Sequence, residues 1–231
     1  IIGRGGGRRG RGVPDPTAGG VGEGGHGMDG TLAIAAAIAI GYALGTIPTG
    51  MIVGRAHGVD LTATGSRRTG ATNVLRTLGP RWAAVVALGD VLKGALAALA
   101  AGALTAWNPW GQVLAAMAAI VGHTYSPFIG FRSGRGVLTG AGGVLIIAPV
   151  AFVVGLVVGS LAIWATRYVS LGSLVAALAA GLVTVAPVLL WAASPAYLVY
   201  GLAVPAFIVL AHRDNIHRLL SGTERKLGER A

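Results

Sequence analysis

Three polar blocks that lie between apolar stretches carry the residue types that bind phosphate. The first block, residues 65–80, holds Ser66, Arg68, Asn73 and Arg76 among several glycines. Glycines let backbone N–H groups converge on an anion, and hydroxyl and guanidinium groups add further donors. A short helix here would place Asn73 and Arg76 on one face. A capped amphipathic helix on a membrane surface is the alternative that this pattern leaves open.

The second block, residues 122–137, places Arg132 and Arg135 among glycines at the mouth of an apolar stretch. The planar fork of arginine matches phosphate oxygens two at a time, so the loop is a candidate phosphate cradle. Positive anchors at the cytoplasmic end of a membrane helix are the simpler interpretation of the same two residues.

The third block, residues 212–224, begins where the last apolar stretch ends. A helix would place His212 and Asn215 on one face, because they are three residues apart. Histidine can hold or move a proton near neutral pH. A lone histidine at a helix end is more often an interfacial cap, so this block is a weak signal by itself.

Two ionisable residues, Asp90 and Lys93, interrupt another apolar stretch and share one helix face. Charge inside a bilayer is costly, so the two are expected to pair with each other or to face a polar cavity. An internal ion pair that fixes helix packing is at least as good an account as contact with a substrate.

The composition is that of an integral membrane protein. Hydrophobic residues make up 54% of the 231 residues and charged residues 11%, against about 25% charged residues in soluble domains. The net charge is +10, but the basic residues lie between apolar stretches. That placement favours a membrane surface or an anionic substrate over nucleic acid. Cysteine and a His-Glu-x-x-His sequence are both absent, so no metal is expected.

The apolar stretches predict an all-α polytopic membrane bundle of about seven transmembrane helices. They cover roughly residues 31–54, 82–106, 111–128, 136–148, 149–166, 171–192 and 196–211. The Lys/Arg-rich loops fall on one side, which predicts the N-terminus outside and the C-terminus in the cytoplasm. The glycine pairs Gly41/Gly45 and Gly155/Gly159 have the spacing of close helix contacts, although lipid-facing glycines would show it too.

Residues 1–27 differ from the rest of the chain, because they are rich in glycine and arginine and contain no apolar run. This composition predicts a disordered tail. Met28 directly precedes the first apolar stretch, and we expect it to be the biological start, with the tail outside the native protein. An arm that binds nucleic acid is the alternative.

In their order along the chain, these motifs resemble the bacterial acyl-phosphate-dependent glycerol-3-phosphate acyltransferases, the PlsY family. The resemblance covers about residues 28–226 and implies that residues 28–231 form a membrane-embedded acyltransferase domain. The matching runs are Thr46–Gly50, Gly65–Ser66, Gly70–Arg76, Asp90–Gly94, Gly122–His123, Gly134–Val137, His212–Ile216 and Gly222–Glu224.

The resemblance implies transfer of a fatty acyl group from acyl phosphate to the sn-1 hydroxyl of glycerol 3-phosphate, which yields lysophosphatidic acid and phosphate in phospholipid biosynthesis. His212 would orient or deprotonate the hydroxyl and Asn215 would hold His212 or the substrate, although a substrate phosphate could instead be the base. The phosphate-binding residues would be Ser66, Arg68, Asn73, Arg76, Arg132, Arg135 and Ser173. Ser170 and Ser173 could equally be helix-capping serines.

The same resemblance places the protein in the bacterial inner membrane, among lipids, with a site that faces the cytoplasm. It implies acyl phosphate and glycerol 3-phosphate as substrates, a soluble enzyme that supplies the acyl phosphate, no cofactor and no nucleic-acid partner.

The chain departs from the family pattern at a few positions. Arg67 and Arg68 stand where the family usually has Gly-Asn, Arg132 and Arg135 where it has lysine, and Ser133 where it has glycine. Arginine in place of lysine keeps phosphate affinity but changes the contact geometry.

Three other functions stay open on the sequence alone. They are a transporter or channel for a phosphorylated anion, a non-catalytic membrane scaffold, and an acyltransferase that uses acyl-CoA. A transporter needs polar residues at the midplane of the bilayer, whereas here they cluster in three blocks at one side.

Overall fold

The computed structural model describes residues 29–131 and 133–229, and every regular element in these ranges is a helix. The main helices are α1 (Gly30–Thr46), α4 (Pro80–Leu104), α5 (Pro109–Thr124), α6 (Val137–Ile147), α7 (Pro149–Thr166), α8 (Val169–Trp191) and α9 (Pro195–Ala211). The short elements are α2 (Thr49–Ala56), α3 (Ala71–Thr77), the 3-10 turn η1 (Pro127–Ile129) and α10 (Arg213–Leu220). The all-α prediction is confirmed. The predicted tail, residues 1–27, lies outside the described residues.

Local signals explain where several helices start. The side chain of Asp29 caps α1, and the side chain of Asn108 accepts a hydrogen bond of 2.9 Å from the backbone at the start of α5. Pro109 follows Asn108 in the first turn, where a missing N–H costs nothing. Gly79 has a φ of 89°, which favours glycine. It therefore forms the corner between the end of α3 and Pro80 at the start of α4.

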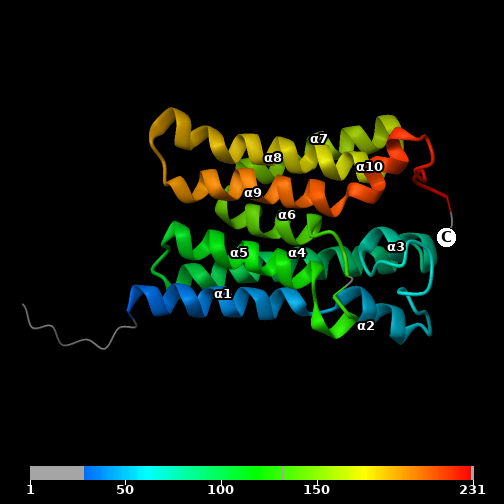
Figure 1. The fold of residues 1–231 in the computed structure, drawn as a ribbon, viewed down its shortest axis with the longest axis horizontal. Helices are drawn as coiled ribbons and strands as arrows, with labels where there is room; N and C mark the ends of the chain where they lie inside the picture. Colours follow the sequence, from blue (N-terminus) through cyan, green and yellow to red (C-terminus); the bar gives the residue numbers. More distant parts are fainter. Residues whose placement is uncertain (1–28, 132, 230–231) are drawn as a thin grey trace, which may run out of the picture.

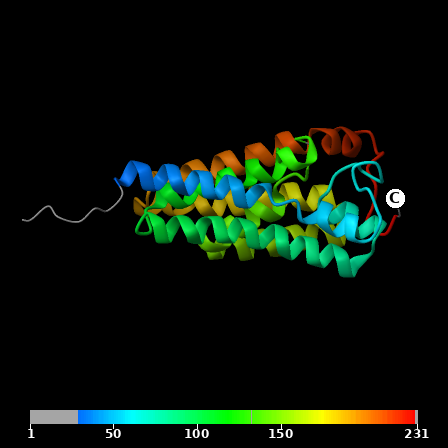
Figure 2. The same cartoon turned by 90° about the horizontal axis from the view of Figure 1, so that it is seen from below.

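The main helices pack in two groups with α6 between them. Helices α1, α4 and α5 contact one another, α8 contacts both α7 and α9, and α6 touches α4, α5 and α7 (Figure 1). Because all of these helices run roughly along the long axis of the molecule, their ends define two opposite faces of the bundle (Figure 2).

Both predicted glycine pairs lie at close helix contacts. A Cβ atom at Gly41 or Gly45 would strike the backbone of α5, and one at Gly155 or Gly159 would crowd Ala176 of α8. Glycine at these positions removes the side chain that would separate the helices. The helix-contact interpretation is therefore confirmed for both pairs.

Five helical segments among the described residues are long and apolar enough to cross a membrane. They are Gly30–Ala56, Pro80–Leu104, Pro109–Ile129, Pro149–Thr166 and Val169–Trp191, and the pair α9–α10, bent by 63°, makes a sixth if it is one span. Helix α6 has only 11 residues and is shorter than a straight span. The first apolar stretch is broken at Pro48, between α1 and α2. The count of seven spans and the orientation stay predictions.

The polar blocks meet at the end of the bundle that lies opposite the start of α1, where α2, α3 and α10 gather (Figures 1 and 2). Arg68 bridges all three blocks, because its guanidinium lies 3.9 Å from the carboxylate of Asp214 and donates to the carbonyl oxygen of Ser133 at 3.5 Å. Arg76 donates to the carbonyl oxygen of Arg225 at 3.3 Å. Segments far apart in the sequence thus enclose one space.

Candidate functional site

A cavity of about 650 Å³ opens at the polar end of the bundle and continues between helices α6, α7, α8 and α9. Its polar mouth is lined by residues of all three blocks. Its deeper part is lined by apolar side chains that include Leu138, Val144, Phe152 and Leu156. The cavity therefore offers a charged site and an apolar channel in one continuous space.

Eight of the nine predicted site residues line this cavity, namely Ser66, Arg68, Asn73, Arg76, Arg135, Ser173, His212 and Asn215. The ninth, Arg132, lies outside the described residues. The three blocks thus contribute to one site, and the roles assigned to the individual residues stay predictions.

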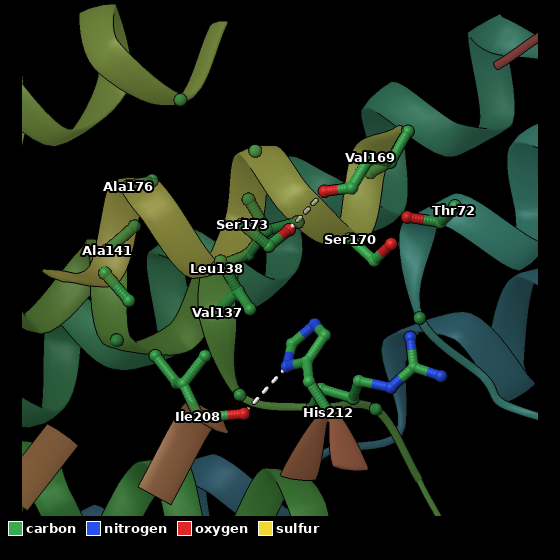
Figure 3. A pocket seen from close by; sticks show the side chains of 18 of the residues that line it. Thr72, Val137, Leu138, Ala141, Val169, Ser170, Ser173, Ala176, Ile208 and His212 are labelled. Carbon is green, nitrogen blue, oxygen red and sulfur yellow. Dashed lines mark hydrogen bonds between the residues drawn. The ribbon is translucent and has the colours of Figure 1, made fainter. Parts of the chain in front are cut away.

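His212 stands at the junction of α9 and α10, where it is 2% exposed. Its Nδ1 atom lies 2.8 Å from the carbonyl oxygen of Ile208. Because a carbonyl oxygen only accepts, Nδ1 carries the hydrogen and Nε2 is left to accept a proton. Figure 3 shows the imidazole between Ile208 and the α8 residues Ser170 and Ser173. Burial, and then the charge of Arg135, lowers the pKa of His212 to about 4, so the ring is neutral at physiological pH.

Arg135 reaches the same part of the cavity from the loop before α6. Burial, followed by repulsion from Arg68 and Arg218, lowers the pKa of Arg135 to about 10, which still leaves it charged at neutral pH. Its Nε atom is buried and has no hydrogen-bond partner among the described residues. Buried donors in proteins are normally hydrogen-bonded, and an anionic ligand in the cavity would provide an acceptor for this one.

Asn215 is held by a carboxylate that comes from the C-terminal tail. Its Nδ2 atom donates to Glu224 Oε1 at 2.6 Å, while its Oδ1 atom is buried without a partner among the described residues. Glu224 also accepts from Ser170 Oγ at 2.7 Å and from Arg218 Nε at 2.7 Å. Burial alone would raise the pKa of Glu224, but these three hydrogen bonds outweigh it and hold that pKa below its usual value.

Asn73 uses its amide to brace the loop of the first block. Its Nδ2 atom donates to the carbonyl oxygens of Arg68 at 2.8 Å and Thr64 at 3.0 Å, and its Oδ1 atom accepts from the backbone N–H of Ser66 at 2.9 Å. Asn73 is 2% exposed. We therefore infer that Asn73 holds the conformation of the loop that carries Ser66 and Arg68, and that it does not bind phosphate itself.

Ser173 and Arg76 are also partly committed to protein contacts. Ser173 Oγ donates to the carbonyl oxygen of Val169 at 2.9 Å within α8 (Figure 3). It can still accept a hydrogen bond from a ligand, because a hydroxyl has two lone pairs. Arg76 keeps the remaining hydrogens of its guanidinium after its contact with the tail.

Glu224 and His123 also line the cavity, although neither is among the predicted site residues. Glu224 lies in the third block and belongs to one of the matching runs, which was a usable signal. His123 lies in the second block, and no spacing rule connects it to the ion pair of Asp90 and Lys93, which it contacts in space.

Fold and site together define a multi-pass helical membrane protein with a basic cavity at one end of its bundle. The chain belongs to the glycerol-3-phosphate acyltransferase family, whose model, described as glycerol-3-phosphate acyltransferase, matches residues 35–222.

Curated relatives carry the same description. Glycerol-3-phosphate acyltransferase 1 of Deinococcus radiodurans is 42% identical over 201 residues, which is 87% of this chain and 98% of that protein. The glycerol-3-phosphate acyltransferase of Rubrobacter xylanophilus is 44% identical over 199 residues, with 84% of this chain and 95% of that protein covered. These relatives come from bacteria, and the match spans nearly their whole length.

A solved structure has the same fold. A crystal structure of PlsY (YgiH), an integral membrane glycerol 3-phosphate acyltransferase, in its glycerol 3-phosphate form, superposes with a TM-score of 0.77 at 32% identity, over 85% of this chain and 96% of that chain. The lysophosphatidic acid form of the same protein gives a TM-score of 0.76 at 32% identity, with the same coverage. The expected family is therefore confirmed, and this chain is a membrane acyltransferase.

Proposed function

We propose that this protein transfers the acyl group of an acyl phosphate to the sn-1 hydroxyl of glycerol 3-phosphate and so forms lysophosphatidic acid and inorganic phosphate. The observation that carries the proposal is the single cavity that joins a mouth lined by Arg68, Arg76 and Arg135 to an apolar channel between α6 and α9. Both substrates bear phosphate, and one of them also bears a hydrocarbon chain that needs such a channel.

The proposed chemistry is a direct transfer. The hydroxyl oxygen of glycerol 3-phosphate attacks the acyl carbon, a new ester C–O bond forms, and the bond from that carbon to the phosphate oxygen breaks. Nε2 of His212 accepts the hydroxyl proton, which can pass on to the departing phosphate. A group that is neutral at neutral pH suits this role, because a protonated imidazole cannot accept.

The arginines would neutralise the charge that builds on the leaving phosphate. Two anionic reactants repel each other in water, and fixed guanidinium groups in a partly buried site offset that repulsion without having to reorganise. Asn215, held by Glu224, would orient glycerol 3-phosphate through its unpaired Oδ1 atom, which can accept a hydrogen bond from a substrate hydroxyl. Positioning of this kind can supply much of the rate enhancement, because a mixed anhydride is already activated.

We further propose that the site faces the cytoplasm from the inner membrane, because the Lys/Arg-rich loops gather at its end of the bundle. A soluble enzyme that makes acyl phosphate would then deliver the donor to this face. A single cysteine introduced near Arg225 and treated with a membrane-impermeant thiol reagent tests this orientation. We expect labelling only in opened cells, and labelling in intact cells would contradict a cytoplasmic site.

One assay separates the candidate functions. Purified protein in lipid nanodiscs receives labelled glycerol 3-phosphate with palmitoyl phosphate, with palmitoyl-CoA, or with no donor. We expect labelled lysophosphatidic acid with palmitoyl phosphate only. Product with palmitoyl-CoA only would overturn the proposed donor, and uptake of label into proteoliposomes without product would favour an anion transporter.

The role of His212 is tested in the same assay. Replacing a general base commonly costs about 10²–10⁴-fold in rate, so we expect His212→Ala to lose turnover by that order while the protein still inserts. His217→Ala is the matched control, because His217 is an exposed residue of the adjoining α10 and lies outside the cavity lining. Near-normal turnover of His212→Ala would remove His212 from the chemistry.

A further inference from the structure

A buried polar cluster lies beside the cavity at the depth of the membrane helices. Asp90 and Lys93 of α4 pair at 2.8 Å, and His123 of α5 lies 2.6 Å from Lys93 and 3.5 Å from Asp90. Thr49 of α2 donates to Asp90 at 2.6 Å. Asp90, Lys93 and His123 are 2%, 3% and 6% exposed. Charges buried to this degree in a membrane protein are costly and call for a function.

The hydrogen bonds of Lys93 define the state of the His123 ring. An ammonium group has three hydrogens and no acceptor. Lys93 Nζ contacts Asp90 Oδ1, the carbonyl oxygen of Ile47 at 3.2 Å, and Nδ1 of His123. With Lys93 charged, Nδ1 of His123 accepts, and the hydrogen of the ring then sits on Nε2. The ring is consequently fixed in one orientation by α4 and by the break between α1 and α2.

The free edge of this ring lies against the loop that carries Arg135. A Cβ atom at Gly134 would meet Nε2 of His123 first, and Cε1 at 2.8 Å. The preceding residue, Ser133, is tied to Thr69 by a hydrogen bond of 2.8 Å between their hydroxyls. Gly134 is thus clamped between the His123 ring and the first block, and Arg135 is the next residue along the chain.

We propose that Asp90, Lys93 and His123 form a positioning cluster that sets the place of Gly134 and, through it, of the Arg135 guanidinium in the cavity. The cluster touches Arg135 only through the backbone of the loop, so its members are positioning residues rather than catalytic ones. This inference rests on the proposed function in one respect, namely that Arg135 binds a phosphate of a substrate.

The first test compares kinetic signatures. Arg135→Gln identifies the substrate that Arg135 holds, because loss of its phosphate contact raises the KM for that substrate, while loss of its charge at the leaving phosphate also lowers kcat. Gly134→Ala pushes the loop off the His123 ring, and we expect it to raise the same KM by about tenfold. Gly30→Ala is the control, because a Cβ there meets nothing within 4 Å at the far end of the bundle.

The second test is a rescue that general destabilisation would not produce. His123→Asn keeps an acceptor for Lys93 but removes the ring atoms that a methyl group on Gly134 would meet. We expect the double variant His123→Asn/Gly134→Ala to have a KM at least about threefold closer to wild type than Gly134→Ala alone. The positioning role would be overturned if the effects of His123→Asn and Gly134→Ala on KM simply added. It would also be overturned if these variants raised the KM for a different substrate than Arg135→Gln does.

Two further measurements keep the outcomes separate. If Gly134→Ala does not insert into the membrane, the test falls to His123→Asn alone. This variant must raise the KM for the substrate that Arg135→Gln identifies, and an unchanged KM refutes the positioning role of the cluster. Binding of glycerol 3-phosphate and of inorganic phosphate, measured by calorimetry in nanodiscs, distinguishes this failure from failure of the proposed function. Wild type that binds but does not turn over acyl phosphate refutes the donor alone, and the binding constants of the variants then carry the test. Wild type that neither binds nor turns over refutes both proposals.

Discussion

Replacing Glu224 by glutamine tests how the site holds Asn215. The carboxylate accepts three hydrogen bonds of 2.6–2.7 Å, from Ser170, Asn215 and Arg218, and its side chain is 6% exposed. Glutamine has nearly the same shape but only one acceptor oxygen and no charge. In either orientation of the glutamine amide, its NH₂ group takes the place of a carboxylate oxygen that accepted a hydrogen bond. At least one of the three hydrogen bonds is therefore lost.

The size of the effect follows from the kind of hydrogen bond that is lost. A hydrogen bond to a charged group contributes about 1.5–3 kcal/mol. If that energy holds Asn215 in its reactive position, its loss lowers kcat by about 10- to 150-fold. The same substitution should also lower thermal stability, because the charge of Arg218 loses its partner.

The assay is acyl transfer from palmitoyl phosphate to labelled glycerol 3-phosphate in nanodiscs, with the melting temperature of each variant measured in the same preparation. Glu229→Gln is the matched control, since Glu229 is an exposed residue of the same tail. We expect Glu229→Gln to match wild type in both measurements. Wild-type kcat in Glu224→Gln would refute the idea that this carboxylate holds the reactive residues in place.

The pH dependence of stability provides an independent check on Glu224. Its pKa is lowered on folding, so it stabilises the protein above its unfolded pKa, and that contribution is lost as the pH falls through the folded pKa. The difference in melting temperature between wild type and Glu224→Gln should therefore stay constant from pH 7 to about 5 and shrink at lower pH, as the pH falls through the lowered pKa of Glu224. A difference that does not change with pH would contradict the lowered pKa.

Three further predictions concern other parts of the molecule. Because the pKa of His212 in the substrate-free protein is about 4 and the neutral ring is the proton acceptor, kcat/KM corrected for titration of the substrate phosphates should stay level from pH 8 to about 5.5 and fall below that; an acid limb near 6.5 that remains after this correction would contradict it. Gly94→Ala should cost about 1–3 kcal/mol of stability by forcing α4 from α6, whereas Gly30→Ala should leave the melting temperature unchanged. Arg68→Asn breaks a half-exposed 3.9 Å contact with Asp214 and a long hydrogen bond of 3.5 Å to the carbonyl oxygen of Ser133, so stability should change by less than about 1 kcal/mol, while KM for a phosphate-bearing substrate rises; an unchanged KM would place Arg68 outside the binding site.

Two of the residues at which the sequence is expected to depart from the family pattern, Arg68 and Ser133, form contacts between the polar blocks. Arg68 reaches both Ser133 and Asp214, so it joins the first block to the other two at the mouth of the cavity. Ser133, where glycine is expected from the family resemblance, forms a hydrogen bond of 2.8 Å between its hydroxyl and that of Thr69. These two unusual residues therefore contact each other's loop, and each adds a tie between the first and second blocks.

The sequence by itself determined the class of fold and eight of the polar residues that line the site. Hydropathy acts within one segment, so the apolar stretches could be recognised without any partner. The three polar blocks were recognisable for the same reason, since the residue types glycine, arginine and histidine by themselves indicate anion binding or proton transfer.

Only the tertiary structure decided how these residues are used. The contact of Glu224 with Ser170 spans 54 positions and that of His123 with Lys93 spans 30. Asn73, expected to bind phosphate, donates hydrogen bonds from its amide to carbonyl oxygens of its own loop. Which side chains meet across such distances depends on how whole helices pack, and this packing depends on glycine contacts and buried hydrogen bonds between segments that no local pattern relates.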